Sequence, residues 1–136
     1  MTGSTDVLQR LQSIELENIT AKYLEYNRPS LQIKIMEFAI VFASMMYCDS
    51  QFKVSQRLSN QLAQLMQSPN RRVKMIAIKA CTELVDYGRW SEEDGFDIKP
   101  MVEIIVHESD QQVLRLAINL FLQVCHEIDD ENVCLQ

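Results

Sequence analysis

The chain has 136 residues and a formal net charge of −6, with 47% hydrophobic and 24% charged residues. These values suit one globular domain with a real core, and they exclude a disordered or low-complexity chain. The sequence also lacks a candidate membrane-spanning segment, because no apolar run reaches the roughly 18 residues that a spanning helix needs.

The four cysteines and the start of the sequence predict an intracellular protein of the cytoplasm or nucleus. Cys48, Cys81, Cys125 and Cys134 are widely spaced, unlike a disulfide framework, so we expect reduced thiols. The first residues are small and polar, without the basic and apolar regions of a secretory signal.

Helical periodicity and turn residues predict short and long helices in alternation. Pro29 indicates a turn at 27–30, Gly88 a helix C-terminus, and Ser109-Asp110 both the end of one helix and the cap of the next. The loop 90–97 is the longest, and an acidic tail is expected to fray after Ile128. The predicted helices cover about 5–26, 31–47, 54–66, 71–87, 98–106 and 111–128.

A short pattern occurs three times, in residues 35–40, 73–78 and 113–118. Each copy reads apolar, any, any, apolar, Ala, Ile, and the alanines Ala39, Ala77 and Ala117 are 38 and 40 residues apart. A period near 40 in a helical sequence is typical of stacked helical repeats. We therefore divide one domain, 1–136, into repeats of about 5–49, 51–88 and 97–128 and an acidic tail, 129–136.

The repeated helix pairs resemble the armadillo/HEAT family. The resemblance lies in the apolar–Ala–apolar rhythm of two inner helices and implies an all-α, right-handed α-solenoid of about three pairs. An ordinary six-helix bundle could show the same spacing. The family's extended-peptide readers carry an Asn six residues after the alanine, where this chain has Met45, Glu83 and Gln123, so that type of peptide binding is not implied. The residues that carry the rhythm are Val73, Ile76, Ala77, Ala80, Cys81 and Leu84, with counterparts Val113, Leu116, Ala117, Leu120, Phe121 and Val124.

Charge is distributed unevenly: −2 over residues 1–50, +5 over 51–90 and −9 over 91–136, which sum to −6. The basic patch contains Arg71, Arg72, Lys74 and Lys79, and it begins at a predicted helix N-terminus, which itself favours anions. An acidic partner would relieve this accumulation of positive charge. The alternative is intramolecular neutralisation by the acidic C-terminal segment.

Two apolar residues complete the predicted binding set. Trp90, in the long loop, is a candidate aromatic anchor for a partner, or else a plug between the second and third repeats. Leu122 stands where the earlier repeats have Ser44 and Thr82, so the last helix has become apolar on a face that no further repeat covers. We predict that Leu122 lies at an interface, either with a second copy or with another protein.

The sequence offers little for catalysis or for metal and cofactor binding. Cys125 and His126, with His107 or Cys134, form the one Cys/His cluster, and adjacent helical residues point in different directions. No phosphate-binding glycine loop or nucleophile motif occurs. We expect no enzyme, no cofactor and no metal. The methionines are expected in the core, or else in a soft groove for a partner helix.

These observations favour a non-catalytic scaffold or adaptor that binds a partner protein, such as an acidic peptide or helix, and that could associate with itself through an open end. The alternative function is a nucleic-acid-associated helical protein that uses the basic middle repeat. The net charge of −6 opposes this alternative, because acidic proteins repel phosphates at long range.

Overall fold

The computed structural model describes residue 15 and residues 17–45, 55–86 and 98–134, and this part of the chain is helical, without a strand. A first helix occupies residues 17–24. The helices that follow are α2 (Pro29–Met45), α3 (Gln56–Leu65), α4 (Arg71–Asp86), α5 (Lys99–His107) and α6 (Gln111–Cys134). The predicted all-α class is confirmed.

Side-chain caps fix the starts of three helices. The Leu58 N–H donates to Ser55 Oγ at the start of α3, and the Val73 N–H donates to Asn70 Oδ1 at the start of α4. Asp110 Oδ1 accepts from the backbone N–H of residues 112 and 113, as predicted for the cap of α6. These bonds satisfy N–H groups that have no partner inside their own helix.

Two predicted boundaries were wrong. Helix α2 begins at Pro29 rather than near Leu31, because proline has no N–H to lose and suits the first helical turn. Helix α6 continues to Cys134, whereas the prediction ended it at Ile128 with a frayed tail over 129–136. The segment that follows Ile128 is acidic, and it contains no Gly or Pro that would end the helix.

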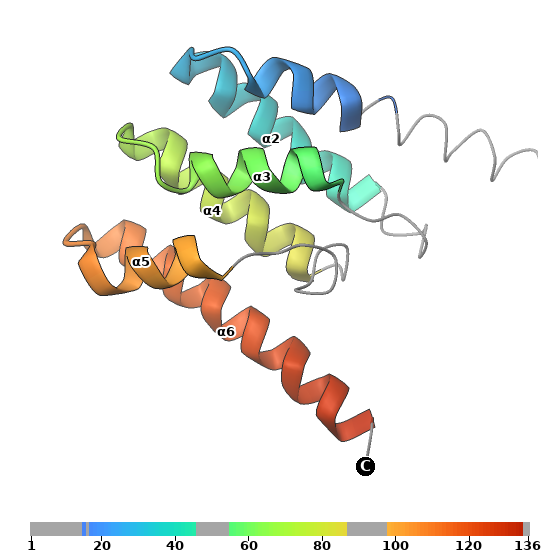
Figure 1. The fold of residues 1–136 in the computed structure, drawn as a ribbon, viewed down its shortest axis with the longest axis vertical. Coiled ribbons are helices and arrows are strands. Elements are labelled where there is room, and N and C mark those ends of the chain that lie inside the picture. Colours follow the sequence, from blue (N-terminus) through green and yellow to red (C-terminus); the bar gives the residue numbers. More distant parts are fainter. Residues whose placement is uncertain (1–14, 16, 46–54, 87–97, 135–136) are drawn as a thin grey trace, which may run out of the picture.

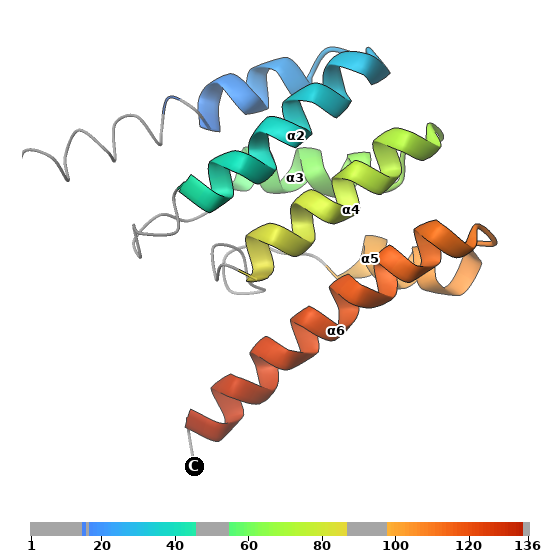
Figure 2. The same ribbon diagram turned by 180° about the vertical axis from the view of Figure 1, so that it is seen from behind.

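The helices form two layers. Helices α2, α4 and α6 lie side by side and run in the same direction, as Figure 2 shows most clearly. The first helix, α3 and α5 cover the other side of this layer (Figure 1). Helix α4 is the central element, since it packs against α2, α3 and α6, while α5 packs against α6.

The three repeated alanines occupy equivalent buried positions on the parallel helices. Ala39 on α2, Ala77 on α4 and Ala117 on α6 are 3%, 0% and 1% exposed. Their small side chains let neighbouring helices approach closely. The core includes Met36, Met66 and Met101, all fully buried, so these methionines are packing residues as expected.

One carboxylate is buried between the first helix and α3. Glu17 is 7% exposed, and its Oε1 accepts a hydrogen bond from the backbone N–H of Ser55, 3.0 Å away. Burial raises the pKa of Glu17, and the hydrogen bonds from Ser55 offset this rise in part. Sequence analysis did not single out this residue.

We predict that Glu17→Gln stabilises the protein at neutral pH. An acid whose pKa is raised by folding destabilises the native state once its carboxyl ionises, so stability falls as pH rises from about 4.5 through the folded pKa. Glutamine stays neutral and its Oε1 can still accept from Ser55. Urea unfolding of wild type and variant should therefore diverge between pH 4 and pH 7, in favour of the variant.

The matched control for this prediction is Glu15→Gln, an exposed glutamate two residues before Glu17. This control should leave the pH dependence of unfolding unchanged. A Glu17→Gln variant that is less stable than wild type at pH 7 would show that the ionised carboxylate is needed there.

Candidate partner-binding groove

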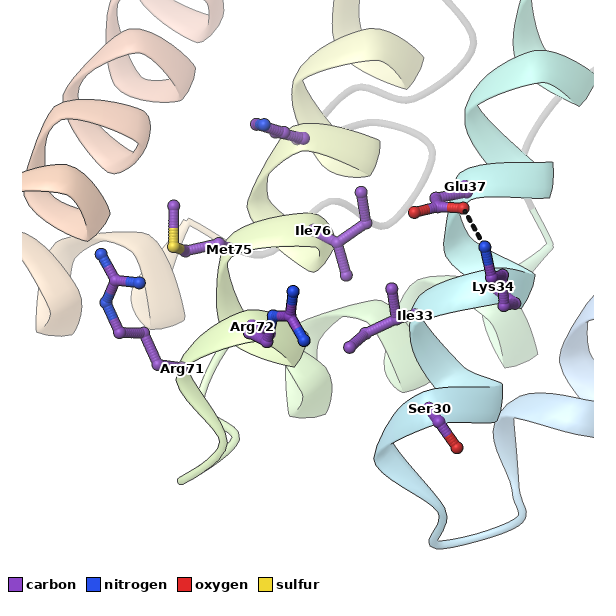
Figure 3. Close-up of a pocket in the computed structure, with 9 residues that line it drawn as sticks. Ser30, Ile33, Lys34, Glu37, Arg71, Arg72, Met75 and Ile76 are labelled. Atoms are coloured by element: carbon purple, nitrogen blue, oxygen red, sulfur yellow. Dashed lines mark ion pairs between the residues drawn. The ribbon is translucent and has the colours of Figure 1, made fainter.

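An open groove of about 500 Å³ lies over the first turns of α2 and α4. Its lining side chains come from α2 and α4, as Figure 3 shows. Its lining residues are Ser30, Ile33, Lys34, Glu37, Arg71, Arg72, Met75, Ile76 and Lys79.

The groove combines half-buried apolar side chains with positive charge. Ile33, Met75 and Ile76 are partly buried and pack against the core. Four lining residues are basic and one is acidic, a net charge of +3 (4 − 1). Figure 3 shows Arg72 and Ile76 of α4 on the side toward Ile33 of α2. The chemistry suits an acidic ligand that also has an apolar side.

The structure divides the predicted basic patch into two parts, the first of which is neutralised within the chain. Arg71 Nε donates to Asp110 Oδ2 at 2.5 Å, and Lys74 Nζ donates to Glu108 Oε2 at 2.9 Å. These pairs join α4 to the turn before α6. Hydrogen bonding to Arg71 and Lys74 holds the pKa values of Asp110 and Glu108 below the usual range.

The second part of the patch remains available to a ligand. Arg72 and Lys79 are exposed, and neither forms an ion pair with any other residue in the described part of the chain. They are seven residues apart on α4, about two helical turns, and so lie on one face. Lys34 of α2 adds a third cation, which pairs loosely with Glu37 at 3.6 Å with both side chains exposed.

The remaining predicted site residues lie elsewhere. Leu122 is on α6, outside the groove, with 58% of its surface exposed. Trp90 lies outside the described residues. The structure thus brings Arg71, Arg72 and Lys79 together in one groove, directs Lys74 to the turn before α6, and leaves Leu122 on a separate surface.

Sequence analysis missed the contribution of α2 to the groove. The 38-residue offset that relates Ala39 to Ala77 also relates Lys34 to Arg72, so applying the repeat to charged positions could have found Lys34. Ser30 and Glu37 carried no comparable signal. Met75 lines the groove, so at this one position the methionine lies where the alternative expectation, a soft groove for a partner helix, would place it.

The described residues contain no other constellation with an evident chemistry. No group of three or more His, Cys, Asp or Glu side chains among them could hold a metal ion. Cys81 is fully buried, and burial raises the pKa of its thiol far above the ordinary value, so this cysteine is a poor nucleophile. None of the described helices is long and apolar enough to cross a bilayer.

Comparison with known proteins yielded no match to any family model, curated protein or solved structure. The resemblance to armadillo/HEAT repeats therefore remains a prediction from the sequence.

Proposed function

We propose that this chain is a non-catalytic protein-binding scaffold or adaptor, built as a short right-handed stack of three armadillo/HEAT-like helix pairs. The groove between α2 and α4 binds an acidic peptide or helix of a partner protein. The observation that carries this proposal is the combination, in one open groove, of an apolar floor with the cations Arg72 and Lys79, which form no ion pair with the other described residues.

The apolar floor supports an amphipathic protein ligand. Ile33, Met75 and Ile76 would cover the apolar side of such a segment, and the cations of the rim would pair with its carboxylates. Methionine suits a groove of this kind because its flexible side chain adapts to the ligand. Recognition of an amphipathic helix by a hydrophobic groove is a common mode of peptide binding.

The charges of the patch favour an acidic protein segment over nucleic acid. Arg71 and Lys74 are already engaged by Asp110 and Glu108, which leaves few cations to track a phosphate backbone. Binding to nucleic acid draws most of its affinity from many phosphate contacts, and the chain as a whole carries −6.

The test is binding of two labelled probes, an amphipathic Glu/Leu helical peptide and a random-sequence oligonucleotide, to wild type and to the double variant Arg72→Glu, Lys79→Glu. We expect the wild type to prefer the peptide. The double variant should bind the peptide about tenfold more weakly, which is about 1.4 kcal/mol, and with less dependence on salt. Fluorescence anisotropy at two salt concentrations measures both effects.

The choice of variants separates binding from folding. Arg71 is left intact because its partner Asp110 also caps α6, so reversing its charge would disturb the fold. Lys22→Glu, on the exposed face of the first helix, is the control for a change of charge outside the groove. Equal peptide binding by wild type and the double variant would exclude the groove. Preference for the oligonucleotide would favour the nucleic-acid function instead.

A further inference from the structure

Helix α6 exposes an apolar face that its counterpart α4 buries. The offset of 40 residues that relates Ala77 to Ala117 pairs the buried positions of the two helices. Four of the pairs are buried in both helices: Val73 with Val113, Ala77 with Ala117, Ala80 with Leu120, and Leu84 with Val124.

The other three pairs differ in burial. Ile78 and Cys81 are 0% exposed on α4, whereas their counterparts Ile118 and Phe121 are each 40% exposed on α6. The third counterpart, Cys125, is half-buried, although Val85 on α4 is 2% exposed. These three α6 positions hold apolar side chains although they are less buried than their counterparts on α4.

The position of α6 in the fold explains this difference. Helix α4 lies between α2 and α6, while α6 packs chiefly against α4 and α5 and has its opposite side at the end of the row (Figure 2). Leu122, 58% exposed, lies one turn after Ile118 and widens the apolar face. We call the surface of Ile118, Phe121, Leu122 and Cys125 the α6 face.

We propose that the α6 face binds the α6 face of a second copy of this chain, with the two helices antiparallel around a twofold axis near Leu122. The chain carries no Asp, Glu, Lys or Arg from Leu116 to His126, so two identical faces can meet without bringing like charges together.

The charges that flank the α6 face favour the antiparallel arrangement. Arg115 lies seven residues before Leu122, and Asp129 lies seven residues after it, each about two helical turns away. An antiparallel pair centred on Leu122 sets position 115 of one copy at the height of position 129 of the other, which opposes unlike charges. A parallel pair would oppose Arg115 to Arg115 instead.

The exposed apolar residues of α2 are a less suitable partner for the α6 face than a second α6 face is. Phe38 and Val41 are exposed on α2, where they stand about one helical turn after Lys34 and Glu37, respectively. Lys34 and Glu37 pair with each other in water, and contact with the uncharged α6 face would remove both charges from water. We therefore infer contact between two α6 helices rather than continuation of the row from α6 of one copy to α2 of the next.

Sedimentation of the full chain over a wide range of concentrations tests the proposal. Wild type should shift from 15.8 kDa toward twice that mass as concentration rises. Leu122→Glu should remain at the monomer mass. Val41→Glu is the matched control, because Val41 is 55% exposed, close to the 58% of Leu122, and this variant should dimerise like wild type.

A charge exchange tests the antiparallel register without altering the apolar face. Arg115→Asp or Asp129→Arg alone should weaken the dimer several-fold, and the double variant should restore it. Circular dichroism checks that each variant is folded.

Several results would overturn the proposal. It fails if wild type stays monomeric, or if folded Leu122→Glu still dimerises. Dissociation by both Leu122→Glu and Val41→Glu would show head-to-tail contact between α6 and α2. A Leu122→Glu variant that unfolds would identify Leu122 as a core residue, and failure of the charge exchange to restore the dimer would exclude the antiparallel register.

Discussion

Replacing Leu120 by alanine is expected to lower the free energy of unfolding by about 2–5 kcal/mol. The Leu120 side chain is 0% exposed and belongs to the core where α6 packs against α4 and α5. The substitution removes apolar surface from the core and leaves a cavity that the surrounding helices fill incompletely. Denaturation by urea, followed by circular dichroism, measures the loss.

Leu122→Ala is the matched control for this substitution, two residues away on the same helix. Leu122 is 58% exposed, so its truncation in the monomer should change stability by no more than about 0.5 kcal/mol. Because both variants make the same chemical change, helix propensity cancels in the comparison. Equal losses would mean that the described orientation of α6 is wrong.

Replacing Ala77 by leucine is expected to cost about 1–3 kcal/mol through overpacking. Ala77 is 0% exposed in the middle of α4, which other helices contact on several sides, so no space exists for three further carbons. Alanine and leucine both favour helices, and the loss can therefore be assigned to packing. Thermal and urea unfolding should report it.

Ala63→Leu, at a half-buried position of α3, serves as the control for Ala77→Leu. Its added side chain can extend toward solvent, so we expect a smaller loss. A stable Ala77→Leu variant would show that the alanine is not required for close approach of the helices, and would weaken the repeat interpretation.

The sequence predicted the parts of the fold that depend on periodicity and local turn chemistry. Ala39, Ala77 and Ala117 each stand among apolar residues three or four positions away, which is the spacing of one helical face, and all three are buried. Asp110 was predicted as a cap, since its side chain bonds to backbone groups only two and three residues away. The solenoid geometry itself remains a prediction.

Features that depend on distant neighbours were not predicted. The buried carboxylate of Glu17 meets a backbone group of Ser55, 38 residues away, and nothing in the local pattern distinguishes Glu17 from an exposed glutamate. The pairing of Arg71 with Asp110 spans 39 residues. The charge totals indicated that the basic patch could be neutralised by the acidic C-terminal segment, but they did not show which cations of the patch would form ion pairs.

Asp110 links the start of α6 to α4 through a single carboxylate. Its Oδ1 accepts from the N–H groups of residues 112 and 113, while its Oδ2 accepts from the Arg71 side chain. The first turn of a helix is its costliest part to form, and here that turn is stabilised by the same group that attaches the helix to its neighbour. Separation of α6 from α4 would therefore also weaken the nucleus of α6. This coupling favours cooperative folding and unfolding of α4 and α6.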